Sequence, residues 1–520
     1  MAQKENTVRK QYNRLKSDRQ PYLDRAYEAA ELTLPFLLPR MTTGKGEDLP
    51  KSFQSLGARL VNTLSSKLLL SQFPPNSPFF KFQIDDFTLS KLGEAPRGLI
   101  EEALGSMERT VMQEVDASSM RVPLYETLRH LIVAGNALLL IDADNNLRVF
   151  HLDQYVIERD PQGKPITIIA MESISKTVFI NRYGFPPPKD PRISGTDKSK
   201  KQDLELYTLI QLDSKTEKYV VTQEVNDVKL QNVRAVYPQD KLPWIPLRFN
   251  AIDGENYGHG LVEESFGDLR AFEGLSQYIL EASAAAAKII FLLRPGSTMT
   301  PKKLANTENL GFLSGVRDDI QTLQLEKFAD LRIASTTAAS LETRLSASFL
   351  LNQSVQRQAE RVTAEEIRFL ANELESTLGG IYSLLSHELQ LPLVRNLINR
   401  LEKKRKLPEL PKGTVKPVIV TGFEALGRSN DAQKIQDFIA SVAASFGPAG
   451  IQVFKLTEVV KRLGNGFAID MKGLVKTEEE LAKERADAQQ DAQNQAMIEK
   501  LGPNAVTQGG QMLQNRQQQG

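Results

Sequence analysis

The chain has 520 residues, of which 41% are hydrophobic and 25% charged, and its formal net charge is +1. A chain of this length exceeds one core of ordinary size, so we expect several packed regions, and its balanced charge argues against a dedicated DNA-binding domain, which would need a strongly basic surface. Because the chain has no cysteine, disulfides, thiolate nucleophiles and cysteine metal sites are excluded.

Neither an export signal nor a membrane span is predicted. Residues 1–20 are polar and charged, without the apolar stretch of a signal peptide. The most apolar runs, at 131–141 and 289–293, fall well short of the roughly 20 residues that a spanning helix needs. We therefore expect no membrane partner, and a protein that is soluble or held in an assembly.

The first half of the chain predicts a mixed α+β region. A basic helix followed by an apolar turn covers 8–38, a second helix covers 53–70, and mainly helical periodicity runs from 100 to 140. Short β-type runs divided by turn residues are found at 138–141, 147–150, 166–169, 206–210 and 219–222. The polar insert at 186–201 is predicted to be an exposed loop.

The middle of the chain predicts two helices that flank a small separate region. A helix is predicted from about Val262 to Leu293, with small residues at 282–287 that would let a neighbouring helix approach closely. Arg294-Pro-Gly296 ends it, and the region up to Glu326 predicts a compact α/β excursion. The chain then returns as a helix over 329–350.

A long amphipathic helix follows a polar link at 352–362. It opens with Thr363-Ala-Glu-Glu366, a capping box. Its apolar residues recur every three or four positions on one face, at Ile367, Leu370, Leu374, Leu378, Ile381 and Leu385. A continuous helix to Lys404 would be roughly 60 Å long, too long for the interior of one compact domain, and Gly379-Gly380 and Pro392 are its predicted kink points.

Short sequence blocks occur in a specific order along the chain. They are Gly57–Arg59, Leu64–Leu68, Val133–Asn136, Gly267–Arg270, Leu323–Lys327, Gln356–Arg368, Leu378–Tyr382, Leu389–Val394 and Gly422–Arg428. Together they span nearly the whole chain and resemble the head-to-tail connector, or portal, proteins of short-tailed podovirus phages.

The resemblance implies a predominantly helical α+β portal fold. Its regions would be an α+β wing (1–264), two stem helices (265–293 and 328–350), a small α/β clip (294–327), a tunnel loop (351–362), a long channel helix (363–406) and a helical crown (407–480). Composition predicts a disordered tail at 481–520, since ten glutamines and few bulky apolar groups occupy residues 489–520.

The resemblance also implies a role in the virion. The chain would form a ring homo-oligomer, a dodecamer, at the portal vertex after assembly in the host cytoplasm, and the ring would be the channel for genome packaging and ejection. Expected partners are double-stranded DNA without sequence specificity, the terminase large subunit, capsid and scaffolding proteins, tail adaptor or nozzle proteins, and internal core proteins. No cofactor and no enzymatic activity are expected.

Two sets of residues are candidates for DNA contact. In the tunnel loop they are Gln353, Gln356, Arg357 and Arg361, with pairing of Arg361 to Glu365 as the alternative. At the end of the long helix they are Lys403, Lys404, Arg405 and Lys406, where cations also favour the helix dipole. For this second set, contact with an acidic partner in place of DNA, and a solvated helix end without a partner, are the alternatives.

Three apparent catalytic or metal motifs carry little weight. Gly422–Ser429 has Walker A spacing, but Arg428 stands where a phosphate loop needs Lys, and the Walker B-like Leu138–Asp142 lies far upstream. Asp142–Asn146 resembles the start of a calcium loop, yet Leu147 replaces the required glycine, so a polar hairpin turn is predicted. The four histidines lack zinc-site spacing. The alternatives to a portal are a P-loop nucleotide-hydrolysing packaging factor and a structural helical scaffold without a DNA channel.

Overall fold

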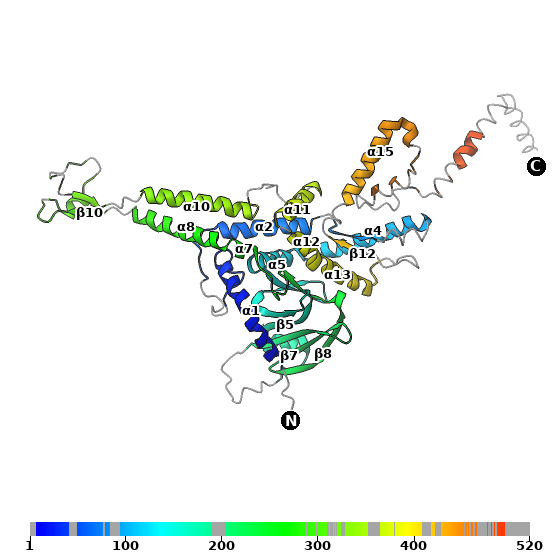
Figure 1. Ribbon diagram of the computed structural model, residues 1–520, viewed down its shortest axis with the longest axis horizontal. Helices are drawn as coiled ribbons and strands as arrows, with labels where there is room; N and C mark the ends of the chain where they lie inside the picture. Colours follow the sequence, from blue (N-terminus) through cyan, green and yellow to red (C-terminus); the bar gives the residue numbers. More distant parts are fainter. Residues whose placement is uncertain are drawn as a thin grey trace, which may run out of the picture. The chain divides into compact units, whose positions relative to one another are not determined.

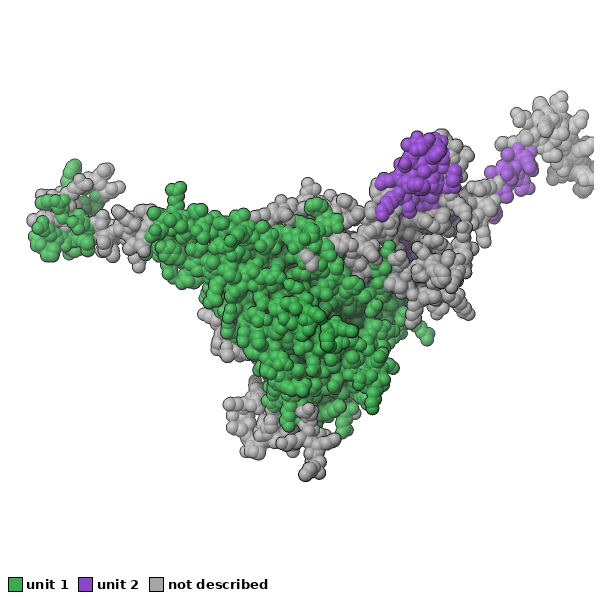
Figure 2. Space-filling model, viewed as in Figure 1, with its two compact units in different colours: residues 1–83, 110–408, 417–425 green, residues 84–109, 409–416, 426–520 purple. Residues whose placement is uncertain are grey.

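The computed structural model describes most of the chain up to residue 451. The described ranges are 7–40, 49–75, 78–83, 94–188, 203–286, 290–297, 299–308, 320–323, 328–351, 364–378, 380–407, 418–421 and 428–451, with scattered positions at 311–318 and 453–493. They fall into two compact units, coloured separately in Figure 2. The first unit comprises residues 1–83, 110–408 and 417–425, and the second comprises residues 84–109, 409–416 and 426–520.

A five-stranded antiparallel sheet forms part of the first unit. Its strands pair in chain order: β4 (Tyr155–Arg159), β5 (Pro165–Ile174), β6 (Leu204–Asp213), β7 (Lys218–Val225) and β8 (Val228–Pro238). Helix α1 (Val8–Glu31) lies against this sheet (Figure 1), with Val8, Tyr12 and Leu15 packed on Val156, Ile169 and Tyr207. The first predicted helix and three predicted strands are confirmed, whereas β4 and β8 escaped prediction.

Arg19 fixes α1 to the turn that precedes β4. The residue is 1% exposed, and its Nη1 donates to the carbonyls of Leu152 (3.0 Å), Asp153 (2.8 Å) and Tyr155 (2.8 Å). A buried guanidinium needs such acceptors to offset its lost hydration. At the start of α1, the backbone N–H of Val8 donates to Glu224 of β7 over 3.0 Å. Residues far along the chain therefore hold α1 in place.

A second, three-stranded sheet has the order β3-β2-β9. Its strands are β2 (Asn136–Ile141), β3 (Leu147–Phe150) and β9 (Trp244–Arg248). Helix α5 (Arg121–Ala134) leads into β2 through left-handed Gly135 and packs on α2 (Leu56–Gln72). The predicted helix at 53–70 and strands at 138–141 and 147–150 are confirmed. Helices α4 (Glu94–Ala117) and α6 (Lys176–Tyr183) complete this half of the chain.

Two antiparallel helices carry the middle of the chain (Figure 1). After the short α7 (Leu261–Glu264), α8 (Phe266–Ala286) runs beside α10 (Phe328–Ser348), and Arg344 lies 2.5 Å from Asp268. The predicted helix to Leu293 is too long, because residues 290–293 form strand β10, paired antiparallel with β11 (Ile320–Leu323). Between these strands lies α9 (Pro301–Ala305), capped by Thr300. The prediction of two helices that flank a small region is confirmed, because α8 and α10 enclose β10, α9 and β11 in the sequence.

The predicted long helix is divided into pieces. They are α11 (Ala364–Leu378), α12 (Ile381–Leu385), a wide π-helical turn (Ser386–Gln390) and α13 (Leu391–Lys403). Gly380 separates the first two with a left-handed φ of 92°, which only glycine adopts without strain. The predicted kink at Gly379-Gly380 is confirmed at Gly380, and the wide turn ends two residues before Pro392. Thr363, the predicted cap, lies outside the described residues.

The remaining elements include one strand of the region predicted as a helical crown. Strand β12 (Val418–Thr421) pairs antiparallel with β1 (Phe80–Gln83), so the region predicted as a helical crown also contains a strand. In the second unit, α15 (Arg428–Ile451) has a kink at Gly447. Residues 486–493, within the predicted disordered tail, are helical and exposed. Residues 494–520, and residues 189–201 of the predicted insert at 186–201, lie outside the described part.

Candidate functional site

The four predicted tunnel-loop residues, Gln353, Gln356, Arg357 and Arg361, lie outside the described residues. The described flanks of this segment are the end of α10 and the start of α11, and both helices contact α2. Near the end of α10, Lys67 of α2 donates to the carbonyl of Leu350 over 2.7 Å, and Arg59 lies 3.2 Å from Glu342. Burial lowers the pKa of Lys67 below its usual value.

The segment after α11 is also fixed to α2. The Tyr382 hydroxyl donates to the carbonyl of Ser71 (3.2 Å), and the Gln72 amide donates to the carbonyl of Tyr382 (3.1 Å). Gln390 in turn donates to the carbonyl of Gln72 over 2.5 Å. These groups are buried, so each hydrogen bond avoids a costly unsatisfied polar atom. Helix α2 therefore holds the chain on both sides of the predicted tunnel loop.

The second predicted set lies at the C-terminal end of α13. Lys403, Lys404, Arg405 and Lys406 are all exposed. Lys406 differs from the others, because its Nζ donates to Glu114 over 3.3 Å. Burial would raise the pKa of Glu114, but hydrogen bonds from Asn145 and Lys406, and the charges of Lys406 and Lys404, lower it below its usual value. Lys403, Lys404 and Arg405 thus form a cationic group at a helix C-terminus, where the helix dipole also favours it.

Arg400, which was not predicted as a site residue, fixes this helix end to the β2–β3 hairpin. It donates to the carbonyls of Ile141 (2.8 Å) and Asp142 and to Asn145 Oδ1 (3.0 Å). Asn145 also donates a hydrogen bond to Glu114 over 2.7 Å, so it connects Arg400 with α4. The sequence offered one signal for this role. Arg400 is next to Leu401 and three positions after Leu397, so it lies close to the buried apolar face of an amphipathic helix.

The apparent nucleotide and calcium motifs do not have the required surroundings. Strand β12, which precedes the Walker A-like segment, pairs antiparallel with β1, whereas β2 with its Walker B-like sequence lies in another sheet. A P-loop fold would place both strands in one parallel sheet. Asp142 accepts from the backbone N–H groups of Asp144 (2.9 Å) and Asn146 (2.8 Å), so the calcium-like segment is the predicted polar hairpin turn.

Metal-binding clusters and membrane-spanning helices are both absent from the described residues. Among the described residues, no three His, Asp or Glu side chains gather closely enough to hold a metal ion. Within the same residues, no helix is both long and apolar enough to cross a bilayer.

Comparison of the sequence with known protein families identifies the family of this chain. Residues 5–475 match the bacteriophage head to tail connecting proteins, and the chain belongs to this family. It is 39% identical to the portal protein of Enterobacteria phage T3 over 486 residues, which covers 92% of this chain and 89% of the T3 protein. For the portal protein of Escherichia phage T7 the identity is 38% over 500 residues, with 94% and 91% covered.

A more distant relative extends the comparison. The portal protein of Enterobacteria phage SP6 is 29% identical over 514 residues, which is 96% of each chain. Among solved structures, a chain from the neck of an empty GTA particle covers 79% of this chain and 90% of its own, at 11% identity and a TM-score of 0.38, too low to assign a fold. The family and its near relatives make the chain a phage portal subunit, which confirms the function predicted from sequence.

Proposed function

We propose that the subunit forms a closed ring at one capsid vertex, and that the ring is the channel for DNA packaging and ejection. The supporting observation is the α8–α10 pair. Of the residues in α8 only Leu269 is buried, and Tyr278, Leu280 and Ile333 are 39%, 55% and 67% exposed. Neighbouring copies joined by head-to-tail contacts, which close by rotation, would cover such surfaces.

The channel contacts are proposed for the tunnel loop. Because a ring repeats each residue once per copy, Arg357 and Arg361 would recur around the bore. Phosphate contacts are screened by salt and carry no sequence preference. Weak contacts of this kind suit a DNA that must move, since tight binding would stall it.

The regions keep their proposed names. The wing would be 1–264, the stem α8 and α10, the clip 294–327, the channel helix 363–406 and the crown 407–480. The clip would dock the terminase large subunit and later the tail adaptor, whereas capsid, scaffolding and internal core proteins would contact other faces. Deleting residues 300–311 should leave α8 and α10 paired but abolish adaptor recruitment. Normal recruitment of the tail adaptor by this variant would show that the clip is not the docking site.

A portal without its own catalytic activity is favoured over a P-loop packaging factor. The supporting observation is the separation of β12 and β2 into different sheets. The purified protein should therefore hydrolyse ATP with magnesium no faster than the buffer does. Clear turnover that tracks the protein through purification would favour the packaging factor instead.

Negative-stain electron microscopy of the purified full-length protein tests the ring directly. The expected result is rings with a central hole. Monomers at the concentrations used would contradict the proposal, and closed particles without a hole would favour a structural scaffold without a DNA channel. A comparison of ring yield between the parent protein and the variant Leu280→Glu, which introduces a charge on α8, would then test the α8 surface.

A further inference from the structure

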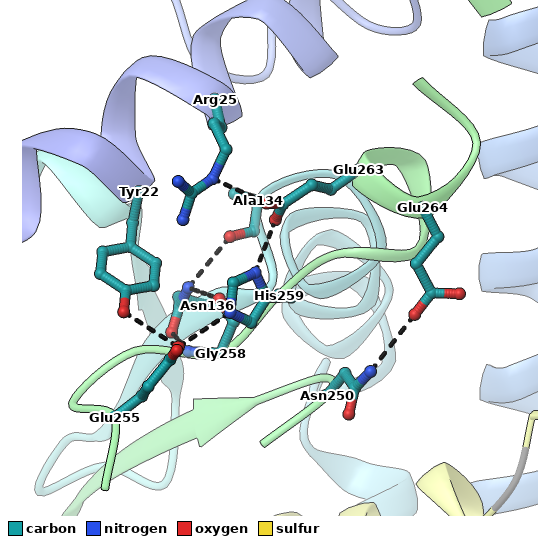
Figure 3. Close-up of polar contacts among 10 residues, drawn as sticks. All are labelled: Tyr22, Arg25, Ala134, Asn136, Asn250, Glu255, Gly258, His259, Glu263 and Glu264. Carbon is teal, nitrogen blue, oxygen red and sulfur yellow. Dashed lines mark hydrogen bonds and ion pairs between the residues drawn. The ribbon is translucent and has the colours of Figure 1, made fainter. Parts of the chain in front are cut away.

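His259 lies between two carboxylates in the loop that precedes α7 (Figure 3). Its Nδ1 is 3.0 Å from Glu263 Oε2, and its Nε2 is 2.8 Å from Glu255 Oε2. Both ring nitrogens therefore face an oxygen that accepts hydrogen bonds. A neutral imidazole has only one N–H group, so it could satisfy one carboxylate and would point a lone pair at the other. The geometry fits an imidazolium, with two N–H donors.

The same carboxylates also bind α1. Glu255 accepts from the Tyr22 hydroxyl (2.9 Å), and Glu263 lies 2.7 Å from Arg25 Nε. The Tyr22 ring lies against the His259 ring, with centroids 5.6 Å apart, and Arg25 lies over the Tyr22 ring at 4.8 Å. These five residues, the His259 network, contain two cations and two anions when His259 is protonated. They join α1 to α7 and thereby to the start of α8.

The backbone around His259 is closely packed and fixed. A Cβ atom on Gly135 would lie 2.4 Å from the His259 carbonyl carbon, and one on Gly260 would lie 2.7 Å from the Ile132 carbonyl oxygen. Asn136 exchanges two hydrogen bonds of 2.7 Å with Gly258 (Figure 3). Because this backbone is held on both sides, a change of charge on the ring acts on its carboxylate partners rather than on its own position.

The other charged groups around this loop are already engaged. Glu264 of α7 accepts from Asn250 over 3.2 Å. On β9, Arg248 passes beside Gly258, but its guanidinium is 2.7 Å from Glu388. The contacts from α5 and β2 come from backbone atoms and from the uncharged Asn136. Tyr22, Arg25, Glu255 and Glu263 are therefore the groups that face the His259 ring.

We propose that the His259 network is a proton-dependent tie between α1 and the root of α8. With the proton, both carboxylates are held and α7 stays docked on α1. When the proton leaves, the neutral ring keeps one carboxylate and repels the other, so the connection from α1 to α7 is weakened. The tie is a property of the single chain and does not depend on the proposed ring.

The direction of the pH dependence follows from the partners. Burial would lower the pKa of His259, but hydrogen bonds and charges from Glu255 and Glu263 raise it above its usual value. A histidine whose pKa is raised by folding contributes stability that is fully present below the unfolded value, about 6.5, and is lost as the pH rises through the folded value. The tie should therefore loosen as the pH rises through the folded-state pKa of His259, which lies above its usual value.

Two exchange measurements on the full-length protein test the tie. Deuterium exchange at the histidine Cε1–H, followed by mass spectrometry, gives the titration midpoint of His259. Backbone hydrogen exchange, corrected for its intrinsic pH dependence, gives the protection of residues 261–270. We expect a midpoint above the usual 6.5 and a loss of protection over the same pH interval. A midpoint at or below that value, or protection that does not follow it, overturns the proposal.

Variants separate the tie from a general loss of structure. At pH 6, His259→Gln and Glu263→Gln should both reduce the protection of residues 261–270, whereas the exposed His387 provides the control His387→Gln, which should not. At pH 9 the parent protein should match His259→Gln, whereas Glu263→Gln should retain a deficit because it also lacks the ion pair with Arg25. If His259→Gln does not fold, the parent curve still decides, together with the gap in protection between the parent and Glu263→Gln, which should be narrower at pH 9 than at pH 6. A gap that does not narrow contradicts the tie.

Discussion

Asn136 and Gly258 exchange two hydrogen bonds, each 2.7 Å long, across 122 positions of the chain. The Asn136 amide nitrogen donates to the Gly258 carbonyl, and the Asn136 side-chain oxygen accepts from the Gly258 N–H. One side chain thus satisfies both polar groups of a glycine for which an added Cβ would meet backbone at 2.9 Å. This contact joins the start of β2 to the loop that carries His259.

Replacing Asn136 with Ala should destabilise the fold by about 2 to 6 kcal/mol, because a buried polar group without its partner costs about 1–3 kcal/mol and the change leaves two such groups on Gly258. Thermal and urea unfolding would measure the loss. Asn13, an exposed residue of α1, provides the control Asn13→Ala, which should be close to the parent. Equal stability of the two variants would mean that water replaces the Asn136 contacts.

The exposed cations of α13 should contribute to DNA binding more than Lys406 does. Changing Lys403, Lys404 and Arg405 together to Gln should weaken binding to duplexes of any sequence and lower the slope of log K against log salt by about 0.9 per lost phosphate contact. Lys406→Gln is the matched control, because Lys406 is paired with Glu114. Fluorescence anisotropy at several salt concentrations measures both. Unchanged binding by the triple variant would leave a solvated helix end.

The tunnel-loop arginines should act on DNA and not on folding. Arg357→Gln with Arg361→Gln should lower the retention of packaged DNA. On the proposal that both arginines face the bore, ring assembly should stay intact, since charges that face water contribute little stability. Each contact is screened over about 8 Å at physiological ionic strength, so the loss should be greatest at low salt. Failure to assemble would make the arginines structural, and normal packaging with normal retention would remove them from the channel contacts.

His130 should make the fold sensitive to acid, in the opposite sense to His259. The residue is 1% exposed, and burial, together with the charge of His151, lowers its pKa to about 3. The unfolded chain takes up a proton below about pH 6.5 that the folded chain excludes, so stability falls as the pH drops from there towards 3. At pH 5 the loss should be about 2 kcal/mol.

The variant His130→Leu isolates this contribution. Urea unfolding of parent and variant at pH 7 and pH 5 gives two stability differences, and subtracting them removes the other titrating groups. The variant should gain about 2 kcal/mol relative to the parent at the lower pH. An identical difference at both pH values would show that His130 becomes protonated without unfolding.

Local sequence patterns predicted the elements whose cause is local. The strand β3 at Leu147–Phe150 follows from a short β-type run between turn residues, and the break at Gly380 follows from a glycine pair. The error at residues 290–293 has a physical reason. Their apolar run continues an alanine-rich helix, and only pairing with β11, about thirty residues later, makes them a strand.

Contacts between distant residues could not be predicted in this way. Arg400 binds main-chain carbonyls of the β2–β3 hairpin. Because every residue has such a carbonyl, the sequence does not indicate which ones accept a hydrogen bond. For His259 a signal did exist, because Glu255 and Glu263 lie four positions before and after it. Outside a helix that spacing predicts no contact, and only the fold of the loop brings both carboxylates to the ring.

The docking of α1 has a consequence for synthesis of the chain. The hydrogen bond from Val8 to Glu224 cannot form until Glu224 has been synthesised, 216 positions later. At 5–20 residues per second, a ribosome needs roughly 10 to 40 s to add those residues. During this interval the apolar face of α1, including Tyr12 and Leu15, has not yet met the strands that cover it. Newly made chains in a crowded cell therefore pass through a period in which chaperone binding competes with aggregation.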